Sequence, residues 1–173
     1  MTAAKGIRPW RGGTFRSETL AGKESTLAGL EPIDDDGTAD RDGLDALARR
    51  TQTVFEAVHQ RVFLGDPVAN PRLAVEVLGA ATAHDTPVLV LITPWTLNGL
   101  AFPPDGELPA TLEVIGRPRQ VFSAELEGLG PFRSVNLVAD VSRLARPEEA
   151  RKLARSFAEP FRAAVERARR PID

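Results

Sequence analysis

A stripe of mostly apolar residues with the spacing of an α-helix begins after the first forty residues. Its side chains recur every three or four positions, and charged or amide residues lie between them. Residues at that spacing share one face of a helix, so the pattern predicts an amphipathic helix from about Asp42 to Val62. The stripe consists of Leu44, Leu47, Thr51, Phe55, Val58 and Val62. Gly65, Asp66 and Pro67 are residue types that end a helix.

Two apolar runs after this helix are typical of β-strands. They comprise Leu73–Leu78 and Val88–Ile92, and a polar turn at residues 83–86 separates them. The second run has no polar residue, which indicates a central strand covered on both faces. Pro94 cannot donate a hydrogen bond to a sheet, so strand pairing should stop there. A further short strand is expected at Leu112–Ile115.

The next segment has the pattern of an antiparallel hairpin. Residues 121–126 and 134–139 alternate between apolar and polar positions, on either side of the glycine-containing turn at residues 128–131. Side chains of a strand point to opposite faces in turn, so this alternation predicts two strands with one face in the core.

A second amphipathic helix is predicted at the carboxyl end. Pro147 suits its first position, and Glu148 and Glu149 suit the positive end of the helix dipole. Its apolar stripe is Leu153, Phe157, Phe161, Ala164 and Ala168. We therefore predict an α+β fold, in which a mostly antiparallel sheet of four to five strands packs with an N-terminal and a C-terminal helix. Both helices are free to cover one face of the sheet.

The first part of the chain lacks any such periodicity. Residues 1–41 mix glycine, serine, threonine, proline and charge with isolated apolar residues, and we expect a loosely ordered leader before a single α+β domain at residues 42–173. The alternative is that Trp10 and Phe15 pack onto the domain and only the glycine-rich and aspartate-rich pieces move.

Composition narrows the possible chemistry. The 173 residues include no cysteine and two histidines, which argues against disulfides, iron–sulfur clusters, zinc knuckles and thiol nucleophiles. We expect no cofactor and no metal site. The net charge of −2 gives no basis for nucleic-acid binding. No apolar segment is long enough for a membrane span or a signal peptide, so we expect a cytoplasmic protein without membrane insertion.

We find no catalytic motif. His84 and Asp85 are adjacent, and a polar turn explains them better than a base with its orienting carboxylate. Gly128-Leu129-Gly130 lies between two strands, so it is read as a turn and not as a dinucleotide-binding loop. Asp34, Asp35 and Asp36 lack the spacing of a calcium loop and are read as a solvated acidic turn that could attract a basic partner segment.

The uncharged stretch Leu89–Pro104 has two interpretations. In one, its large side chains fold into the core. In the other, some of them form an apolar docking patch, which a tryptophan supports because tryptophan is enriched at interface hot spots. The candidate partner-binding residues are Pro94, Trp95, Leu97, Leu100 and Phe102, together with Asp34, Asp35 and Asp36.

The same stretch carries a resemblance to a known family. Ile92-Thr93-Pro94-Trp95 followed by Phe102-Pro103, in this order of helix, strands, hairpin and helix, resembles the HybE/HupJ/HoxT family of nickel-iron hydrogenase assembly chaperones. The similarity extends from about Asp42 to Ala168. Some relatives carry an amino-terminal rubredoxin-like module with iron-binding cysteines, which this chain lacks, so the resemblance transfers no iron site.

The resemblance implies a non-enzymatic accessory protein. Its partners would be precursors of the hydrogenase large or small subunit, and possible further partners are other maturation factors. Some family members keep a complex with a twin-arginine signal from export before its cofactors are inserted. On this hypothesis an apolar patch near Trp95 binds the immature subunit and the acidic stretch binds its basic signal. The alternative function is a small-ligand or metal-delivery binding domain without catalytic activity.

Overall fold

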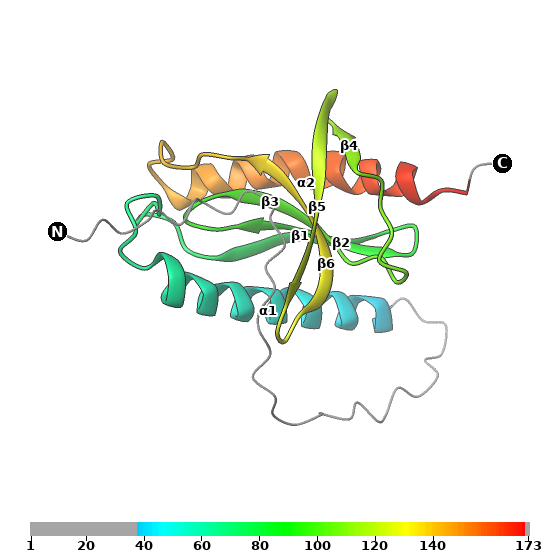
Figure 1. The fold of residues 1–173 in the computed structure, drawn as a ribbon, viewed down its shortest axis with the longest axis horizontal. Coiled ribbons are helices and arrows are strands. Elements are labelled where there is room, and N and C mark those ends of the chain that lie inside the picture. Colours follow the sequence, from blue (N-terminus) through cyan, green and yellow to red (C-terminus); the bar gives the residue numbers. More distant parts are fainter. Residues whose placement is uncertain (1–37, 172–173) are drawn as a thin grey trace.

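A twisted antiparallel sheet lies between two long helices in the computed structural model, which describes residues 38–171 (Figure 1). The helices are α1 (Thr38–Val58) and α2 (Pro147–Arg169), and a short π-helical turn η1 (His59–Phe63) extends α1. The strands are β1 (Glu76–Ala83), β2 (Thr86–Ile92), β3 (Leu97–Ala101), β4 (Thr111–Val114), β5 (Arg117–Leu126) and β6 (Gly130–Val138). The predicted α+β class and antiparallel pairing are confirmed.

The sheet contains six strands in the order β1-β2-β3-β6-β5-β4, slightly more than the predicted four to five. The additional strand is β3, which occupies part of the uncharged stretch and pairs with β2 on one side and β6 on the other. The predicted hairpin is β5–β6, the short predicted strand is β4, and the two apolar runs pair as β1 and β2, although β1 runs from Glu76 to Ala83 and not from Leu73 to Leu78. Strands β1 and β4 form the two edges of the sheet.

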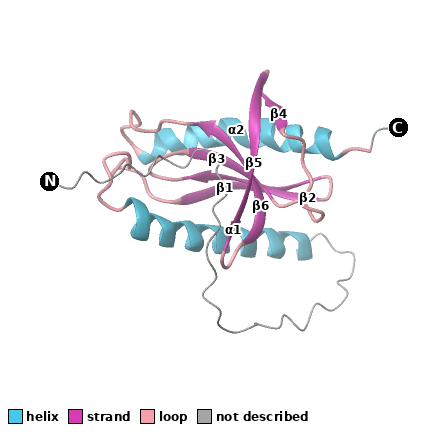
Figure 2. Ribbon diagram, in the orientation of Figure 1, coloured by secondary structure: helices cyan, strands magenta, loops and turns pink. Residues whose placement is uncertain are grey.

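The two helices cover opposite faces of the sheet (Figure 2). The β2 side chains Val88, Val90 and Ile92 belong to the apolar cluster that α2 completes. Leu89 and Leu91, which alternate with them, belong to the cluster beneath α1. The prediction of a central strand covered on both faces is therefore confirmed. The expectation that both helices could cover one face is wrong, because a strand that is apolar on both faces needs a cover on each.

The last turn of the first helix departs from the predicted pattern. α1 ends as an α-helix at Val58, and η1 continues it with the wider π geometry to Phe63. A π turn adds a residue to the turn and rotates the inward face. Phe63 consequently lies in the core at 5% exposure, whereas Val62, the predicted stripe residue, is 37% exposed.

The predicted leader falls largely outside the residues that the structure describes. Asp34, Asp35 and Asp36 lie there, and α1 begins at Thr38, before the predicted start at Asp42. Across residues 38–171 there is no helix that combines the length and apolar character needed to cross a bilayer.

Candidate functional site

The family-like motif forms the tight connection between β2 and β3. Thr93 organises this connection, because its backbone N–H and its hydroxyl both donate to the Thr96 carbonyl at 2.9 Å. The Thr93 hydroxyl oxygen also accepts from the Thr96 N–H at 2.9 Å. Pro94 fills the turn between them and removes an N–H that would have needed a partner. The motif thus fixes how the chain passes from one central strand to the next.

Asn70 joins three separate loops at this end of the sheet. Its backbone N–H donates to the carbonyl of Pro94, and its side-chain amide donates to the carbonyls of Val141 and Leu144 at 2.9 and 2.8 Å. The Asn70 side-chain oxygen accepts from the Arg72 N–H. Because Asn70 is 4% exposed, these hydrogen bonds are shielded from water. A buried polar group that lost its hydrogen bond there would destabilise the fold. We call the region that Asn70 ties together, residues 59–72, 93–96 and 139–146, the loop end.

Trp95 lies beneath η1 within the loop end. Its indole stacks on the Phe63 ring with 4.1 Å between centroids and 14° between planes, and the His59 ring lies at 5.8 Å. Trp95 is 2% exposed, and its Nε1 has no hydrogen-bond acceptor among the described residues. The tryptophan therefore supports η1 from below.

The structure answers whether the uncharged stretch is core or surface. Its large apolar residues are buried in the folded domain: Pro94, Trp95, Leu97 and Leu100 are inaccessible, and Phe102 is half-buried. The core interpretation is the one that the burial supports, because β3 runs through the middle of the sheet. A role for these residues in partner binding stays a prediction.

The loop end exposes apolar side chains that were not among the predicted partner-binding residues. Val62, Leu64 and Val68 are 37%, 71% and 41% exposed, and they flank Phe63 in the chain. We call these three residues the apolar rim. The loop end also carries four exposed arginines that form no ion pair among residues 40–171. They are Arg61, Arg72, Arg143 and Arg146. An apolar rim on the same loop end as these cations can bind a surface that is apolar and acidic.

Asp85 has a structural partner, which fits the predicted polar turn. Both its carboxylate oxygens accept from Arg169, which also binds Asp105. The hydrogen bond from Arg169 holds the pKa of Asp85 well below its usual range. The Arg169 side chain is 12% exposed and clamps the end of α2 to the β1–β2 turn and to the loop before β4. His84 occupies the turn with a φ of 58°.

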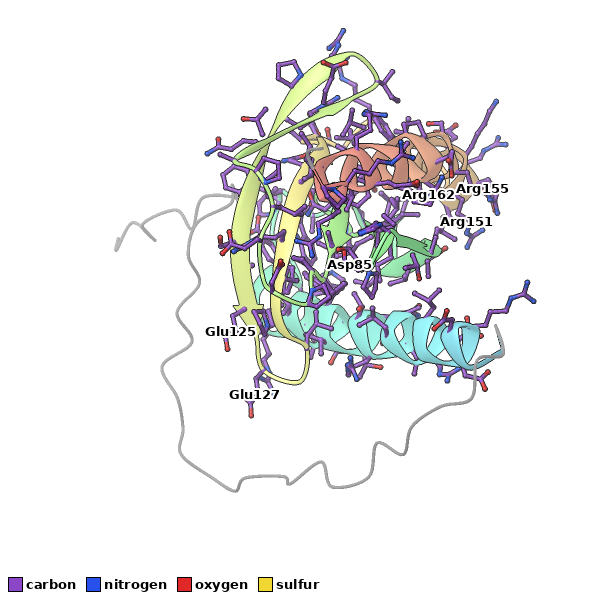
Figure 3. The ribbon with its side chains drawn as sticks, turned by 90° about the vertical axis from the view of Figure 1, so that its right-hand side faces the viewer. Asp85, Glu125, Glu127, Arg151, Arg155 and Arg162 are labelled. Carbon is purple, nitrogen blue, oxygen red and sulfur yellow. The ribbon has the colours of Figure 1, made fainter. Side chains whose placement is uncertain are left out.

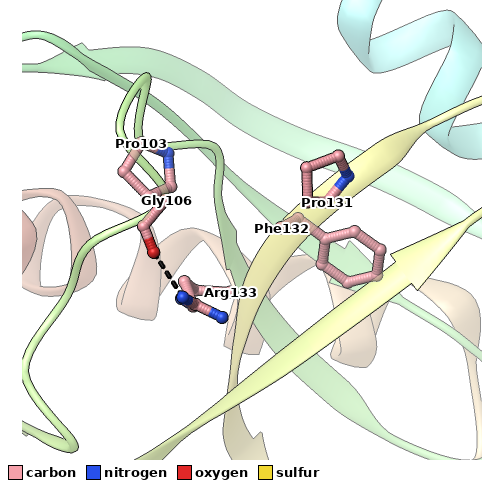
Figure 4. Close-up of a pocket in the computed structure, with 5 residues that line it drawn as sticks. All are labelled: Pro103, Gly106, Pro131, Phe132 and Arg133. Carbon is pink, nitrogen blue, oxygen red and sulfur yellow. Dashed lines mark hydrogen bonds between the residues drawn. The ribbon is translucent and has the colours of Figure 1, made fainter. Parts of the chain in front are cut away.

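The structure also contains a shallow hollow between the loop that follows β3 and the start of β6 (Figure 4). Pro103, Gly106, Pro131, Phe132 and Arg133 line it, and its cavity volume is about 40 Å³. Arg133 crosses it to donate to the carbonyl of Gly106 and the hydroxyl of Ser123. Ligand pockets usually enclose roughly 300–1,000 Å³, so this hollow is small for a metabolite.

Metal binding has no support in the described part of the chain. No group of three or more histidine or carboxylate side chains lies within residues 38–171 in a position to share an ion. His59 packs near Trp95 instead of facing a carboxylate, and Gly128 and Gly130 shape the β5–β6 turn with positive φ angles. Within residues 38–171 the loop end therefore offers surfaces for binding and no cluster suited to holding a metal ion.

The chain is similar to known proteins of hydrogenase assembly. Residues 46–171 match the family model described as NiFe-hydrogenase assembly chaperone HybE. The chain is similar to the hydrogenase expression/formation protein HoxT of Azotobacter vinelandii, with 39% identity over 97 residues, which is 52% of this chain and 63% of that protein. It is also similar to the hydrogenase expression/formation protein HupT of Azotobacter chroococcum mcd 1, with 36% identity over 110 residues, which is 60% of this chain and 73% of that protein.

One solved structure has the same fold. The solution structure of HybE from Escherichia coli aligns with a TM-score of 0.50 and 21% identity, and the alignment covers 65% of this chain and 77% of that one. The family model also covers the loop end, because its match begins within α1 and continues past the end of α2.

Proposed function

Because this chain belongs to the HybE family of nickel-iron hydrogenase assembly chaperones, we propose that it binds a precursor of a hydrogenase subunit through its loop end. The precursor is held before export or final assembly, and the binding takes place in the cytoplasm. Contacts with other maturation factors fit the same role. The chain acts by binding alone and catalyses no reaction.

The exposure of the apolar rim is the observation that carries this proposal. Leu64 is 71% exposed, although burying a leucine side chain is worth about 1.5–3 kcal/mol. Isolated exposed apolar residues are ordinary, but Val62, Leu64 and Val68 gather on one short segment. Such a segment suits an immature subunit, whose apolar surface is not yet buried by its cofactors and partner subunit.

The apolar rim is preorganised, because the residues next to it are packed on the core. Phe63 lies between rim residues in the sequence, and its ring is fixed on Trp95, while Asn70 ties the following loop to the β2–β3 turn. A surface that is already ordered loses less conformational entropy on binding. The predicted role of Pro94 and Trp95 is therefore indirect in this account, since they hold the rim in place.

Charge provides the second part of the proposed contact. The acidic residues Asp34, Asp35 and Asp36 would attract a basic twin-arginine signal, and Arg61 and Arg143 would attract acidic groups on the body of the precursor. Both contacts weaken as salt screens them, with a Debye length of about 8 Å at physiological ionic strength. Proofreading of export follows if the signal is covered while the chaperone is bound.

The alternative of a small-ligand or metal-delivery domain finds no specific support. The hollow beside Arg133 is small, and residues 38–171 contain no cluster suited to an ion. Calorimetric titration with nickel, iron and zinc distinguishes this alternative from the chaperone, which should give no heat of binding with any of them.

Affinity capture tests the proposal. The tagged protein is recovered from cells that produce a nickel-iron hydrogenase, at low and high salt, and the proteins recovered with it are identified by mass spectrometry. Recovery of an unprocessed hydrogenase subunit, with less recovered at high salt, is expected. If no hydrogenase component is enriched over a control bait, the proposed function is wrong.

A further inference from the structure

The turn between β4 and β5 holds an isoleucine in a left-handed backbone conformation that other residue types adopt more easily. Ile115 and Gly116 are the two turn residues, with φ angles of 52° and 64°. Positive φ at both positions defines the type I′ hairpin turn, which strongly prefers Asn-Gly. In this left-handed region the Cβ atom of an L-residue lies too close to the following carbonyl oxygen, and a β-branched side chain is a clear outlier there.

Ile115 gains little from packing that could offset this strain. Ile115 is 57% exposed and is absent from both apolar clusters, although Val114 beside it is fully buried. A Cβ built on Gly116 would meet nothing within 4 Å, so this side of the turn faces open space. Residues kept in strained conformations by a rigid surrounding occur preferentially at functional sites.

The turn is the tip of a projecting arm formed by residues 111–120. β4 pairs with β5 alone, and β5 pairs with β6 only from Val121 onward. Figures 1 and 3 both show this hairpin extending past α2. The arm is anchored along its length, because Leu112 and Val114 are buried against α2 and Arg119 donates to the carbonyls of Asn136 and Leu137 on β6. The arm therefore presents its tip in a fixed position.

The charges near the tip indicate the kind of surface that it fits. Arg117 follows the turn directly, is exposed, and forms no ion pair with any described residue. Arg167 on α2 donates to the backbone carbonyl of Glu113 and keeps its charge at the same place. Arg117 and Arg167 outnumber Glu113, the exposed carboxylate of β4, at this tip, and an apolar cleft with carboxylates at its border fits that excess of positive charge.

We propose that the arm is a second binding element, which inserts Ile115 into a carboxylate-bordered apolar cleft on the hydrogenase subunit precursor. The inference rests on the proposed function, because the partner is the same precursor. The arm and η1 lie at different parts of the molecule (Figure 1), so a partner that contacts both must be a large folded surface. The strain at Ile115 is then retained because asparagine, which relieves it, cannot fill an apolar cleft.

The substitution Ile115→Asn tests this inference, because it separates stability from binding. It should raise Tm by about 2–4 °C, as expected when a turn residue adopts its preferred conformation in a domain of this size. It should also weaken binding to the precursor by at least about tenfold, a loss typical of a buried anchor residue. Ile115→Val keeps the β-branched apolar side chain and serves as the matched control, with affinity close to that of the wild type.

Affinity is measured by biolayer interferometry with purified large-subunit and small-subunit precursors, each immobilised separately. A higher Tm together with weaker binding of Ile115→Asn supports the inference. A higher Tm with unchanged binding overturns the role of the arm and leaves the proposed function intact, and a lower Tm contradicts the strain. If the wild type binds neither precursor, the proposed function itself has failed, and the role of the arm fails with it.

Discussion

The Phe63 ring lies face to face with the Trp95 indole, at 4.1 Å between centroids and 14° between planes. This stack joins η1 to the β2–β3 turn in the buried centre of the loop end. Trp95→Ala should destabilise the domain by about 3–5 kcal/mol, because it removes a large buried side chain and leaves a cavity under Phe63. Chemical denaturation followed by circular dichroism measures this. Trp95→Phe should lose much less, and wild-type stability of Trp95→Ala would show that the indole is not part of the core.

Asn70 should be as sensitive as a core residue, although it is polar. Asn70→Ala removes the donor of two buried carbonyls, Val141 and Leu144, and leaving a buried group unpaired costs about 1–3 kcal/mol. Unfolding in urea should shift to lower denaturant with an unchanged slope. Gln120→Ala changes an exposed amide on β5 and should shift the midpoint very little. Equal midpoints for the two variants would contradict the role of Asn70 as a junction.

Gly99 makes room for a helix residue. A Cβ at this position would lie 2.7 Å from the Phe161 ring, whose aromatic face rests on β3. Gly99→Ala should therefore destabilise the domain by about 1–3 kcal/mol through overpacking. Phe161→Leu should recover part of this loss in the double variant, so the two changes couple. Strict additivity of the two free-energy changes would argue against the close approach of ring and strand.

The ion pairs that Arg169 forms with Asp85 and Asp105 predict that the stability of the domain depends on pH. Arg169 lowers the pKa of Asp85, and the Glu107 N–H and then Arg169 lower that of Asp105. Groups with a depressed folded pKa contribute stability above their unfolded pKa of about 3.9, and that contribution is lost as pH falls through the folded value. Arg169→Gln should therefore be less stable than the wild type at pH 7.

The difference between Arg169→Gln and the wild type should shrink below about pH 4, where the carboxylates take up protons. Thermal unfolding at pH 7, 4 and 2.5 measures it. Arg155→Gln removes an exposed arginine with no ion pair among the described residues and serves as the control. A difference that stays constant between pH 7 and pH 2.5 would show that the clamp does not act through the charges of Asp85 and Asp105.

The sequence predicted those elements whose local pattern agrees with their final surroundings. β2 is apolar at every position from Val88 to Ile92, and the α2 stripe keeps the helical period, so both were identified correctly. β3 was missed because Asn98-Gly99 normally marks a hairpin turn, whereas here the glycine is required by Phe161 on a distant helix. A contact between residues so far apart in the chain leaves no signal in a local window.

In the candidate site, too, some features could be predicted from the local sequence and others could not. The motif at Ile92–Trp95 could be recognised, yet its burial could not, because an uncharged stretch suits a core strand and a docking patch equally. The apolar rim depends on the π turn of η1, which rotates Val62 outward and Phe63 inward. Asn70 gave no signal at all, since its partners Val141 and Leu144 are more than seventy residues away.

Binding of a hydrogenase precursor by variants of the apolar rim tests the central claim most directly. The double variant Leu64→Ser with Val68→Ser removes exposed side chains and should keep the Tm of the wild type. Calorimetry with purified large-subunit and small-subunit precursors should show an affinity at least about tenfold weaker for this variant, while Lys152→Ser on the exposed side of α2 leaves it unchanged. Equal affinities of the rim variant and the wild type would contradict the account.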